Sequence, residues 1–214
     1  MNNTSKKRVL IFASGSKDGG GSGFENLVRK SRETDLGFEV VAVISNHENG
    51  GVRQKADKLE IPFVHFEKPY TSERYLELVN NWSPDLISLS GWLKLCHGLP
   101  PQRTINIHPG LLPEFGGDGM YGHFVHEAVM KAYKEGRVLT SGLSMHFVTE
   151  KYDEGPVFFR CEVPIFPDDT PESLAKRVNE AEHKWQPEIT GKVARGEIFW
   201  DGVTPESLNT TISV

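Results

Sequence analysis

Apolar runs of strand length alternate with segments of helical periodicity along most of the chain. The run 38–45, FEVVAVIS, is apolar almost throughout, as expected for a parallel strand that is covered on both faces. In the second half, two strand-like runs flank the turn-rich segment KYDEGP and could pair as an antiparallel extension. The pattern predicts an α/β fold with a doubly wound, mostly parallel sheet that becomes mixed in its second half. The expected strands span 8–13, 38–45, 62–66, 85–90, 104–107, 142–148 and 157–163, and the expected helices span 24–32, 51–59, 123–133 and segments that begin at 72 and 170.

Two of the expected helices begin at recognisable capping residues. Ser72 is expected to be an N-cap, because its hydroxyl can accept a hydrogen bond from a free N–H of the first turn. Tyr75 and Val79 follow it at helical spacing. Thr170 and Pro171 predict an N-cap followed by proline at the first helical position, where no backbone N–H is needed.

The length of 214 residues favours a single domain, expected to span 1–214. We predict a Rossmann-type, nucleotide-binding half over about 8–105 and a second half over about 106–200. A core of this size needs no disulfide or metal to hold it together. Cys96 and Cys161 have neither CxxC nor Cys/His spacing, so we expect free, buried thiols in a reducing compartment.

Composition and charge exclude several classes of protein. The chain is 37% hydrophobic with a mean hydropathy of −0.40, and it has no apolar run near the roughly 18 residues that a membrane span requires. The formal net charge is −5 without any Lys/Arg-rich run, so the electrostatic footprint of nucleic-acid binding is missing. The apolar run VLIFA near the N-terminus is too short for a signal peptide. We therefore expect a cytoplasmic protein that acts on small molecules.

A glycine-rich segment, ASGSKDGGGSGFENL, follows the first expected strand and leads into a helix. Glycines permit positive φ and close backbone approach, and a helix N-terminus offers unpaired N–H groups to an anion. The segment lacks the Lys-Ser/Thr of a P-loop and does not match GxGxxG directly after the strand, so it predicts either a phosphate site or a flexible connector. In a phosphate site, Ser22 and the amides of 21–24 would be the donors.

Two polar side chains are expected at the rim of the sheet. Asn106 and His108 lie two apart on a strand and so share a face, and Pro109 ends regular pairing where the crevice of an open α/β sheet opens. Alone they are compatible with a structural pair. Asp153, in the KYDEGP loop, could reach the same edge, where a carboxylate raises the pKa of an imidazole and orients it. Such a trio suits acyl transfer to an amine, or hydrolysis, with an amide donor for a developing oxyanion. His146 could line the site or simply occupy the core.

Other chemistries find little support along the chain. No serine or cysteine lies in a nucleophile setting such as GxSxG. His123 and His126 are three apart on an expected helix, but the surrounding sequence is not HExxH. We therefore expect no metal site.

The segments NIHPGLLPEF and SMHFVTEKYDEGPV, about 40 residues apart, resemble the folate-dependent formyltransferase family, and the similarity runs from VLIFASGS to AEHKWQP. The resemblance implies a formyltransferase-like fold and transfer of a formyl group from 10-formyltetrahydrofolate to the amine of glycinamide ribonucleotide, in purine biosynthesis. It implies that Asn106 and protonated His108 stabilise the oxyanion of a tetrahedral intermediate. Asp153 would keep His108 charged and assist proton transfer.

The same resemblance implies where the two substrates bind. The second half would bind folate between the segment SGWLKLC and the segment from Val148 to Asp153, and the ribonucleotide phosphate would lie on the glycine-rich segment. Glu182 would contact the glycinamide amine. The implied folate-binding residues are Leu93, Lys94, Leu95, Cys96, Val148 and Thr149, and the implied ribonucleotide-binding residues are Gly21, Ser22, Gly23 and Glu182.

The chain also departs from the family pattern. The glycine-rich segment is longer by KDGG, and Gly23 stands where many members carry a phosphate-binding asparagine. Gly110 replaces a serine of the usual HPSLLP, which a turn should tolerate, and GGDGMYGHFVHEAV differs from the shorter form of that loop. These departures affect ligand contacts rather than the expected chemistry.

Alternatives remain within and outside the family. Another formyltetrahydrofolate-dependent formyltransferase or a formyltetrahydrofolate hydrolase would use the same trio. The tRNA-directed members normally add a C-terminal domain and the hydrolases an N-terminal one, and neither extension is recognisable here. A non-catalytic folate- or nucleotide-binding module would have no need of all three residues. The expected partners are small molecules, and the expected oligomeric state is a monomer or a homodimer.

Overall fold

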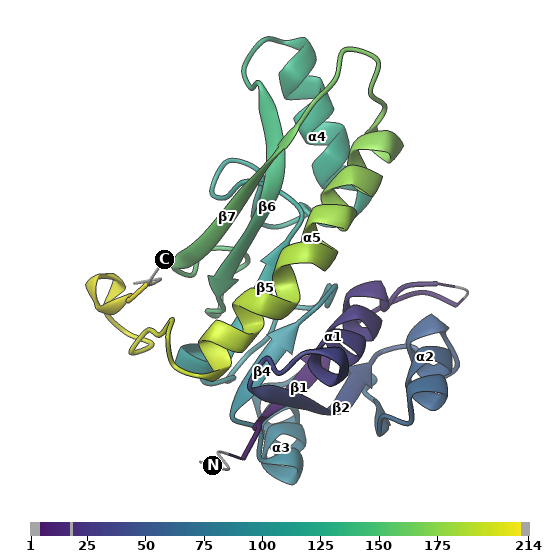
Figure 1. The fold of residues 1–214 in the computed structure, drawn as a ribbon, viewed down its shortest axis with the longest axis vertical. Helices are drawn as coiled ribbons and strands as arrows, with labels where there is room; N and C mark the ends of the chain where they lie inside the picture. The colour runs from purple at the N-terminus through teal and green to yellow at the C-terminus, as the bar shows by residue number, and fades with distance from the viewer. Residues whose placement is uncertain (1–4, 18, 211–214) are drawn as a thin grey trace.

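One seven-stranded sheet runs through the molecule, in the order β3-β2-β1-β4-β5-β6-β7 (Figure 1). The computed structural model describes residues 5–17 and 19–210, so Asp18 of the glycine-rich segment and both ends of the expected 1–214 domain lie outside the described residues. The strands are β1 Lys7–Phe12, β2 Phe38–Ser45, β3 Phe63–His65, β4 Leu86–Leu89, β5 Thr104–His108, β6 Thr140–Phe147 and β7 Val157–Pro164. The helices are α1 Ser22–Glu33, α2 Gly51–Leu59, α3 Ser72–Trp82, α4 His123–Lys134 and α5 Pro171–Ala194, with 3₁₀ turns at Pro101–Arg103 and Pro205–Ser207.

The strand directions confirm the predicted mixed sheet. Strands β1 to β5 pair in parallel, whereas β6 is antiparallel to both β5 and β7. The chain builds outward from β1 through β2 to β3 and then returns to place β4 on the other side of β1. The carboxyl ends of β1 and β4 therefore form the topological switch point, where open α/β sheets bind their ligands.

Alternation along the strands produces two hydrophobic cores. On β1, Val9 and Ile11 pack in the core that α1, α2, α4 and α5 share, while Phe12 packs in a second core with Tyr75 of α3. On β5 the same alternation buries Ile105 in the first core and turns Asn106 to the opposite face. Over β5 and β6 that opposite face meets the segments 109–122 and 148–156. Ser144 Oγ of β6 accepts a hydrogen bond from the Leu112 N–H and donates one to the Gly110 oxygen.

Helix α5 crosses the sheet and packs beside α1 (Figure 1). A proline inside α5 leaves one backbone carbonyl free to bond to α1. Pro187 has no N–H to donate to the carbonyl of His183, four residues earlier. That carbonyl instead accepts a hydrogen bond of 2.7 Å from Asn26 Nδ2 on α1. The predicted N-cap Thr170, with Pro171 following it, is confirmed and forms a capping box.

Some local predictions need correction. Helix α1 begins at Ser22, two residues before its predicted start, because Gly21 takes the left-handed conformation (φ 73°) at the N-cap. Thr71, not Ser72, occupies the N-cap of α3. Cys96 is buried as expected, but Cys161 is only partly buried because it lies on the edge strand β7. Among the described residues, no helix has the length and apolarity required to cross a membrane.

Candidate active site

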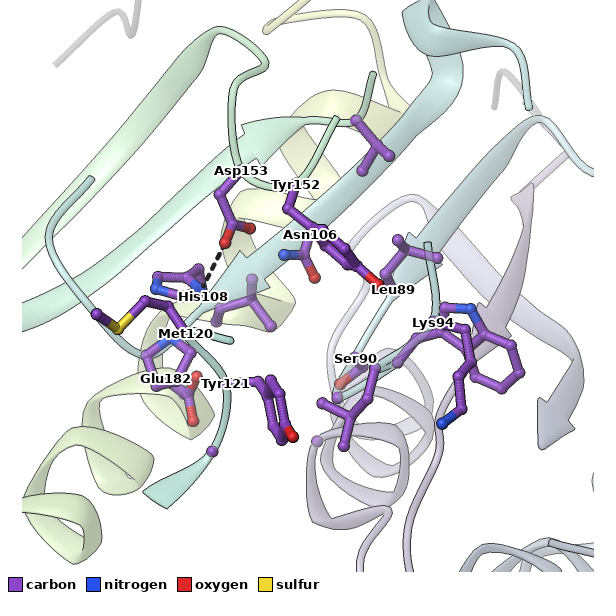
Figure 2. A pocket seen from close by; sticks show the side chains of 18 of the residues that line it. Leu89, Ser90, Lys94, Asn106, His108, Met120, Tyr121, Tyr152, Asp153 and Glu182 are labelled. Carbon is purple, nitrogen blue, oxygen red and sulfur yellow. Dashed lines mark ion pairs between the residues drawn. The ribbon is translucent and has the colours of Figure 1, made fainter. Parts of the chain in front are cut away.

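A cavity of about 460 Å³ lies at the carboxyl ends of β1, β4 and β5, at the predicted switch point (Figure 2). The first turn of α1, one side of α5 and the loops after β4, β5 and β6 complete its walls. The structure therefore brings the predicted site residues together around one cavity. They are Gly21, Ser22, Gly23, Leu93, Lys94, Leu95, Cys96, Asn106, His108, His146, Val148, Thr149, Asp153 and Glu182.

Asn106 and His146 are direct partners across two antiparallel strands. The register of β5 and β6 places them opposite each other, and Asn106 Nδ2 lies 3.1 Å from His146 Nε2. His146 Nδ1 lies 2.8 Å from the carbonyl oxygen of Phe147, which can only accept, so this nitrogen carries a proton. His146 is thus both buried and part of the site. From the sequence, it could have lined the site or only filled the core.

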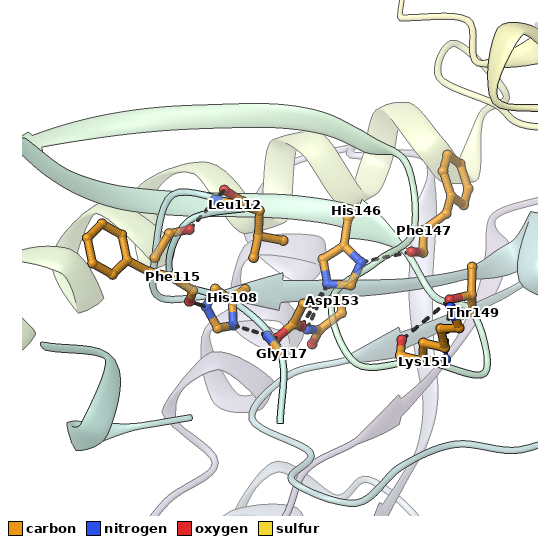
Figure 3. A network of polar contacts seen from close by, with 12 residues as sticks. His108, Leu112, Phe115, Gly117, His146, Phe147, Thr149, Lys151 and Asp153 are labelled. Atoms are coloured by element: carbon orange, nitrogen blue, oxygen red, sulfur yellow. Dashed lines mark hydrogen bonds and ion pairs between the residues drawn. The ribbon is translucent and has the colours of Figure 1, made fainter. Parts of the chain in front are cut away.

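The carboxylate of Asp153 joins both histidines to the loop after β5 (Figure 3). Asp153 Oδ2 lies 3.5 Å from His108 Nδ1 and accepts a hydrogen bond of 3.1 Å from the Gly117 N–H, and Oδ1 lies 3.3 Å from His146 Nε2. The other ring nitrogen of His108 lies 2.6 Å from the carbonyl oxygen of Phe115. Both nitrogens of His108 therefore face oxygen acceptors, and the protonated ring can donate to both.

The local backbone explains the Asp-x-Gly-Pro pattern around Asp153. Asp153 adopts a left-handed conformation (φ 55°), which aspartate tolerates better than most residues. Two residues later the chain passes so close to β6 that a Cβ on Gly155 would overlap the carbonyl oxygen of Phe147. The next residue, Pro156, accepts a hydrogen bond of 3.0 Å from the Phe147 N–H. The pattern thus folds the loop tightly against the end of β6 and holds the carboxylate over His108.

Burial and charge have opposite effects on the pKa of His108 and on that of Asp153. Burial lowers the pKa of His108 below its usual range, although the Asp153 carboxylate acts to raise it. For Asp153, burial alone would raise the pKa, but the adjacent His146 ring, the charge of His108 and the Gly117 N–H together bring it below its ordinary value. That Asp153 keeps His108 charged stays a prediction, in which the carboxylate acts against the desolvation of the ring.

The first turn of α1 presents its backbone to the cavity. Its first intrahelical hydrogen bond runs from the Glu25 N–H to the Gly21 oxygen, so the N–H groups of Ser22, Gly23 and Phe24 point beyond the helix end. The longer glycine-rich segment packs on α2, where the oxygen of Ser16 accepts a hydrogen bond of 3.1 Å from the Gly51 N–H. The described part of the insertion thus leaves the α1 end open.

Glu182 faces the cavity from α5 with an unusual ionisation. Burial raises the pKa of its carboxyl to about 7, although the hydrogen bond from Asn179 Nδ2, at 3.1 Å, acts to lower it. Protein atoms surround the carboxyl closely, while part of the residue surface stays accessible from the cavity. A partner with a positive charge or several N–H donors would stabilise the ionised form.

The loop after β4 lines the cavity together with the loop after β6. It is tied to the loop after β1, because the Ser14 N–H donates to the Gly91 oxygen (2.9 Å) and Ser14 Oγ accepts from the Leu93 N–H (3.0 Å). Leu93 is 39% exposed, whereas Cys96 is 4% exposed and packs in the second core. Burial raises the pKa of the Cys96 thiol to about 12, so it stays protonated and serves as an apolar side chain.

Several residues that line the cavity were not predicted as site residues. Tyr152 and Tyr121 reach into the cavity from the loops after β6 and β5 (Figure 2). His126 of α4 also lines it; burial lowers its pKa to about 4, and its Nδ1 has no hydrogen-bond partner among the described residues. On α5 the cavity-lining residues are Ala175, Asn179, Glu182, His183 and Gln186. Helical spacing from Glu182 would have predicted them. Within residues 5–17 and 19–210, no group of three or more His, Cys, Asp or Glu side chains is placed to hold a metal ion.

Comparisons with known proteins agree with this geometry. The sequence profile of the formyl transferase family matches residues 7–190. The chain is 34% identical to the chloroplastic phosphoribosylglycinamide formyltransferase of Arabidopsis thaliana, over 92% of this chain and 70% of that protein. It is 30% identical to phosphoribosylglycinamide formyltransferase of Bacillus subtilis, over 86% of this chain and 92% of that one. The crystal structure of glycinamide ribonucleotide transformylase 1 from Symbiobacterium toebii superposes with a TM-score of 0.78 and 28% identity, over 90% of each chain.

Proposed function

Since the chain belongs to the formyl transferase family, we propose that it moves the formyl group of 10-formyltetrahydrofolate to the primary amine of glycinamide ribonucleotide. The names of the relatives support this choice of acceptor. One observation carries the proposal: Asn106, His108 and Asp153 lie at the rim of the same cavity that the expected folate and ribonucleotide residues line.

The reaction needs an oxyanion stabiliser and a route for one proton. The lone pair of the acceptor amine attacks the formyl carbon, a C–N bond forms, and the formyl oxygen becomes negative. Asn106 Nδ2 would donate to that oxygen, and the positive charge of protonated His108 would stabilise it. The bond from the carbon to N10 of the folate then breaks, and the proton lost by the amine ends on N10, with Asp153 assisting its transfer. Holding both substrates in the cavity makes the attack effectively unimolecular.

The ionisation of His108 would change during this reaction. Burial of the ring favours its neutral form. A negative oxygen forming near His108 favours the protonated ring, as Asp153 does. Charge on His108 is thus most favoured when the intermediate forms, which is where stabilisation lowers the barrier.

The two substrates would bind to different parts of the cavity wall. Leu93, the backbone of 94–96, Val148 and Thr149 line one part, which suits the flat pterin ring of the folate. The phosphate of the ribonucleotide would lie on the N–H groups of 21–24, with Ser22 Oγ as a further donor. Glu182 would accept hydrogen bonds from the glycinamide amine.

The test mixes purified protein with 10-formyltetrahydrofolate, with and without glycinamide ribonucleotide, and follows the formyl donor by absorbance and the product by mass spectrometry. We expect donor loss only when the amine is present, with one formylated amine per donor consumed. Equal loss without the amine would indicate a formyltetrahydrofolate hydrolase. No loss in either mixture would refute the enzyme proposal, and transfer to other amines but not to this one would refute the acceptor.

Two further expectations concern the setting of the protein rather than its chemistry. We propose a monomer or a homodimer and a cytoplasmic location, and light scattering of the purified protein measures the oligomeric state directly.

Binding of the ribonucleotide through its phosphate is tested separately. Inorganic phosphate should compete with glycinamide ribonucleotide, and Ser22→Ala should weaken that competition. Unchanged competition in Ser22→Ala would show that the phosphate does not bind at Ser22.

A further inference from the structure

The side chain of Ser90 occupies the space that Gly23 leaves empty. Ser90 follows β4 directly, its side chain lines the cavity, and the residue is 7% exposed (Figure 2). A Cβ built on Gly23 would overlap Ser90 Oγ and lie 3.1 Å from Gln186 Oε1. Glycine at position 23 therefore lets a hydroxyl from another element approach the first turn of α1.

The hydrogen bonds of this hydroxyl leave its proton available. Gln186, 1% exposed on α5, donates from Nε2 to Ser90 Oγ over 3.1 Å. The nearest acceptor among the described residues is Oε1 of the same amide, at 3.5 Å, too long for a strong O–H donor bond. Ser90 Oγ is thus held as an acceptor by Gln186, while its own proton can be donated into the cavity.

The surroundings indicate what would accept that proton. The N–H groups of Ser22, Gly23 and Phe24 and the positive end of the α1 dipole meet at this end of the cavity. His183, which lines the same cavity from α5, has a buried Nε2 without a hydrogen-bond partner among the described residues. A ligand bearing several oxygen acceptors and negative charge would satisfy these groups together.

We propose that Ser90 is a specificity-determining residue whose hydroxyl donates a hydrogen bond to the phosphate of the acceptor substrate. Gln186 is its positioning residue, and Gly23 makes the contact sterically feasible. The inference rests on the proposed function for the identity of the phosphoester. In this proposal Ser90 supplies the side-chain hydrogen-bond donor that Gly23 cannot provide.

Ribose 5-phosphate is the probe that tests the contact without turnover. Calorimetry measures its affinity for the wild-type protein, for Ser90→Ala and for the control variant Ser88→Ala. Ser88 is a buried serine of β4 that does not line the cavity. We expect about a 10- to 100-fold loss of affinity in Ser90→Ala, the usual effect of one hydrogen bond to a charged group, and none in Ser88→Ala. Gly23→Ala should give a similar loss by displacing the hydroxyl.

Gln186→Met separates positioning from a purely structural role. The substitution keeps the volume of the side chain and removes its amide, so we expect a higher KM for glycinamide ribonucleotide with kcat and the KM for the folate unchanged. A fall in kcat with unchanged KM would contradict the positioning role. Circular dichroism confirms that each variant is folded.

The outcomes separate this inference from the proposed function. If Ser90→Ala alone among the serine variants loses ribose 5-phosphate but the wild type formylates no glycinamide ribonucleotide, the Ser90 contact stands and the acceptor is wrong. If the wild type formylates the ribonucleotide and all variants bind ribose 5-phosphate equally, the function stands and the Ser90 contact is refuted. Absence of any binding by the wild-type protein overturns the phosphate subsite itself.

Discussion

Replacing Glu182 by glutamine should make the protein more stable at alkaline pH. Burial holds the pKa of the Glu182 carboxyl at about 7, against an ordinary 4.5. One pKa unit corresponds to about 1.36 kcal/mol, so the full difference corresponds to roughly 3 kcal/mol of unfavourable free energy in the ionised folded state. Because the residue keeps part of its surface accessible, we expect about half of that, roughly 1–2 kcal/mol.

The sign follows from proton binding in the two states. Between pH 4.5 and about 7 the folded protein binds a proton at Glu182 that the unfolded chain has released, so this contribution to stability is fully present below pH 4.5 and is lost as the pH rises through 7. Glutamine resembles the protonated form and keeps an oxygen that can accept from Asn179. Glu182→Gln and wild type should therefore be equally stable at pH 4.5 and differ at pH 8.5.

Urea denaturation at these two pH values measures the difference. The matched control is Glu180→Gln, an exposed carboxylate on the same helix, which should change stability little at either pH. A gain in Glu182→Gln that is the same at both pH values would show that the carboxyl does not titrate near neutrality. A loss at pH 8.5 would refute the argument, since it would mean that the folded state stabilises the charge.

Three further substitutions test other parts of the site. Asp153→Asn should lower kcat at least about a hundredfold, as expected for loss of a group that supports acid–base catalysis. Gly155→Ala should lower the free energy of unfolding by about 1–3 kcal/mol, because the new methyl group overlaps a carbonyl of β6. Asn26→Ala should lower it by about 1–3 kcal/mol, because it leaves the α5 carbonyl freed by the internal proline without its side-chain donor.

Two of these substitutions have a control variant, and each has a result that would contradict it. Glu154→Gln changes an exposed neighbour of Asp153 and should leave kcat near wild type; near-normal turnover in Asp153→Asn would refute its catalytic role. Gly19→Ala meets only an ordinary contact with Ser16 Oγ at 3.4 Å, so its stability should barely change. For Asn26, equal stability of the alanine variant and wild type in urea denaturation would show that water replaces the side chain without cost.

The fold was accessible from the sequence because its strand signal is local. The apolar run Phe38–Ser45 and the helix Gly51–Leu59 match their predicted bounds, since buried parallel strands and amphipathic helices carry their period in consecutive residues. Helix ends were less accessible. The early start of α1 depends on the left-handed conformation of Gly21, and a run of glycines does not reveal which one adopts it.

The site divides in the same way. Asn106 and His108 could be placed from a period of two and a proline, both of which are local signals. The pairing of Asn106 with His146 depends on the register between β5 and β6, which the sequence does not encode in any short pattern. The Ser90–Gln186 pair joins residues 96 positions apart and so was not predictable either. The desolvation that lowers the pKa of His108 was not predictable either, because burial depends on the complete fold.

The interrupted hydrogen bond of α5 also bears on how the protein opens. A helix with an internal proline normally contains a weak point at which one half can unwind alone. Here the free carbonyl of His183 is bonded to Asn26, so unwinding beyond Pro187 also breaks a bond to α1. Amide hydrogens of α1 and of the second half of α5 should therefore exchange with solvent through a common opening event, as one cooperative unit.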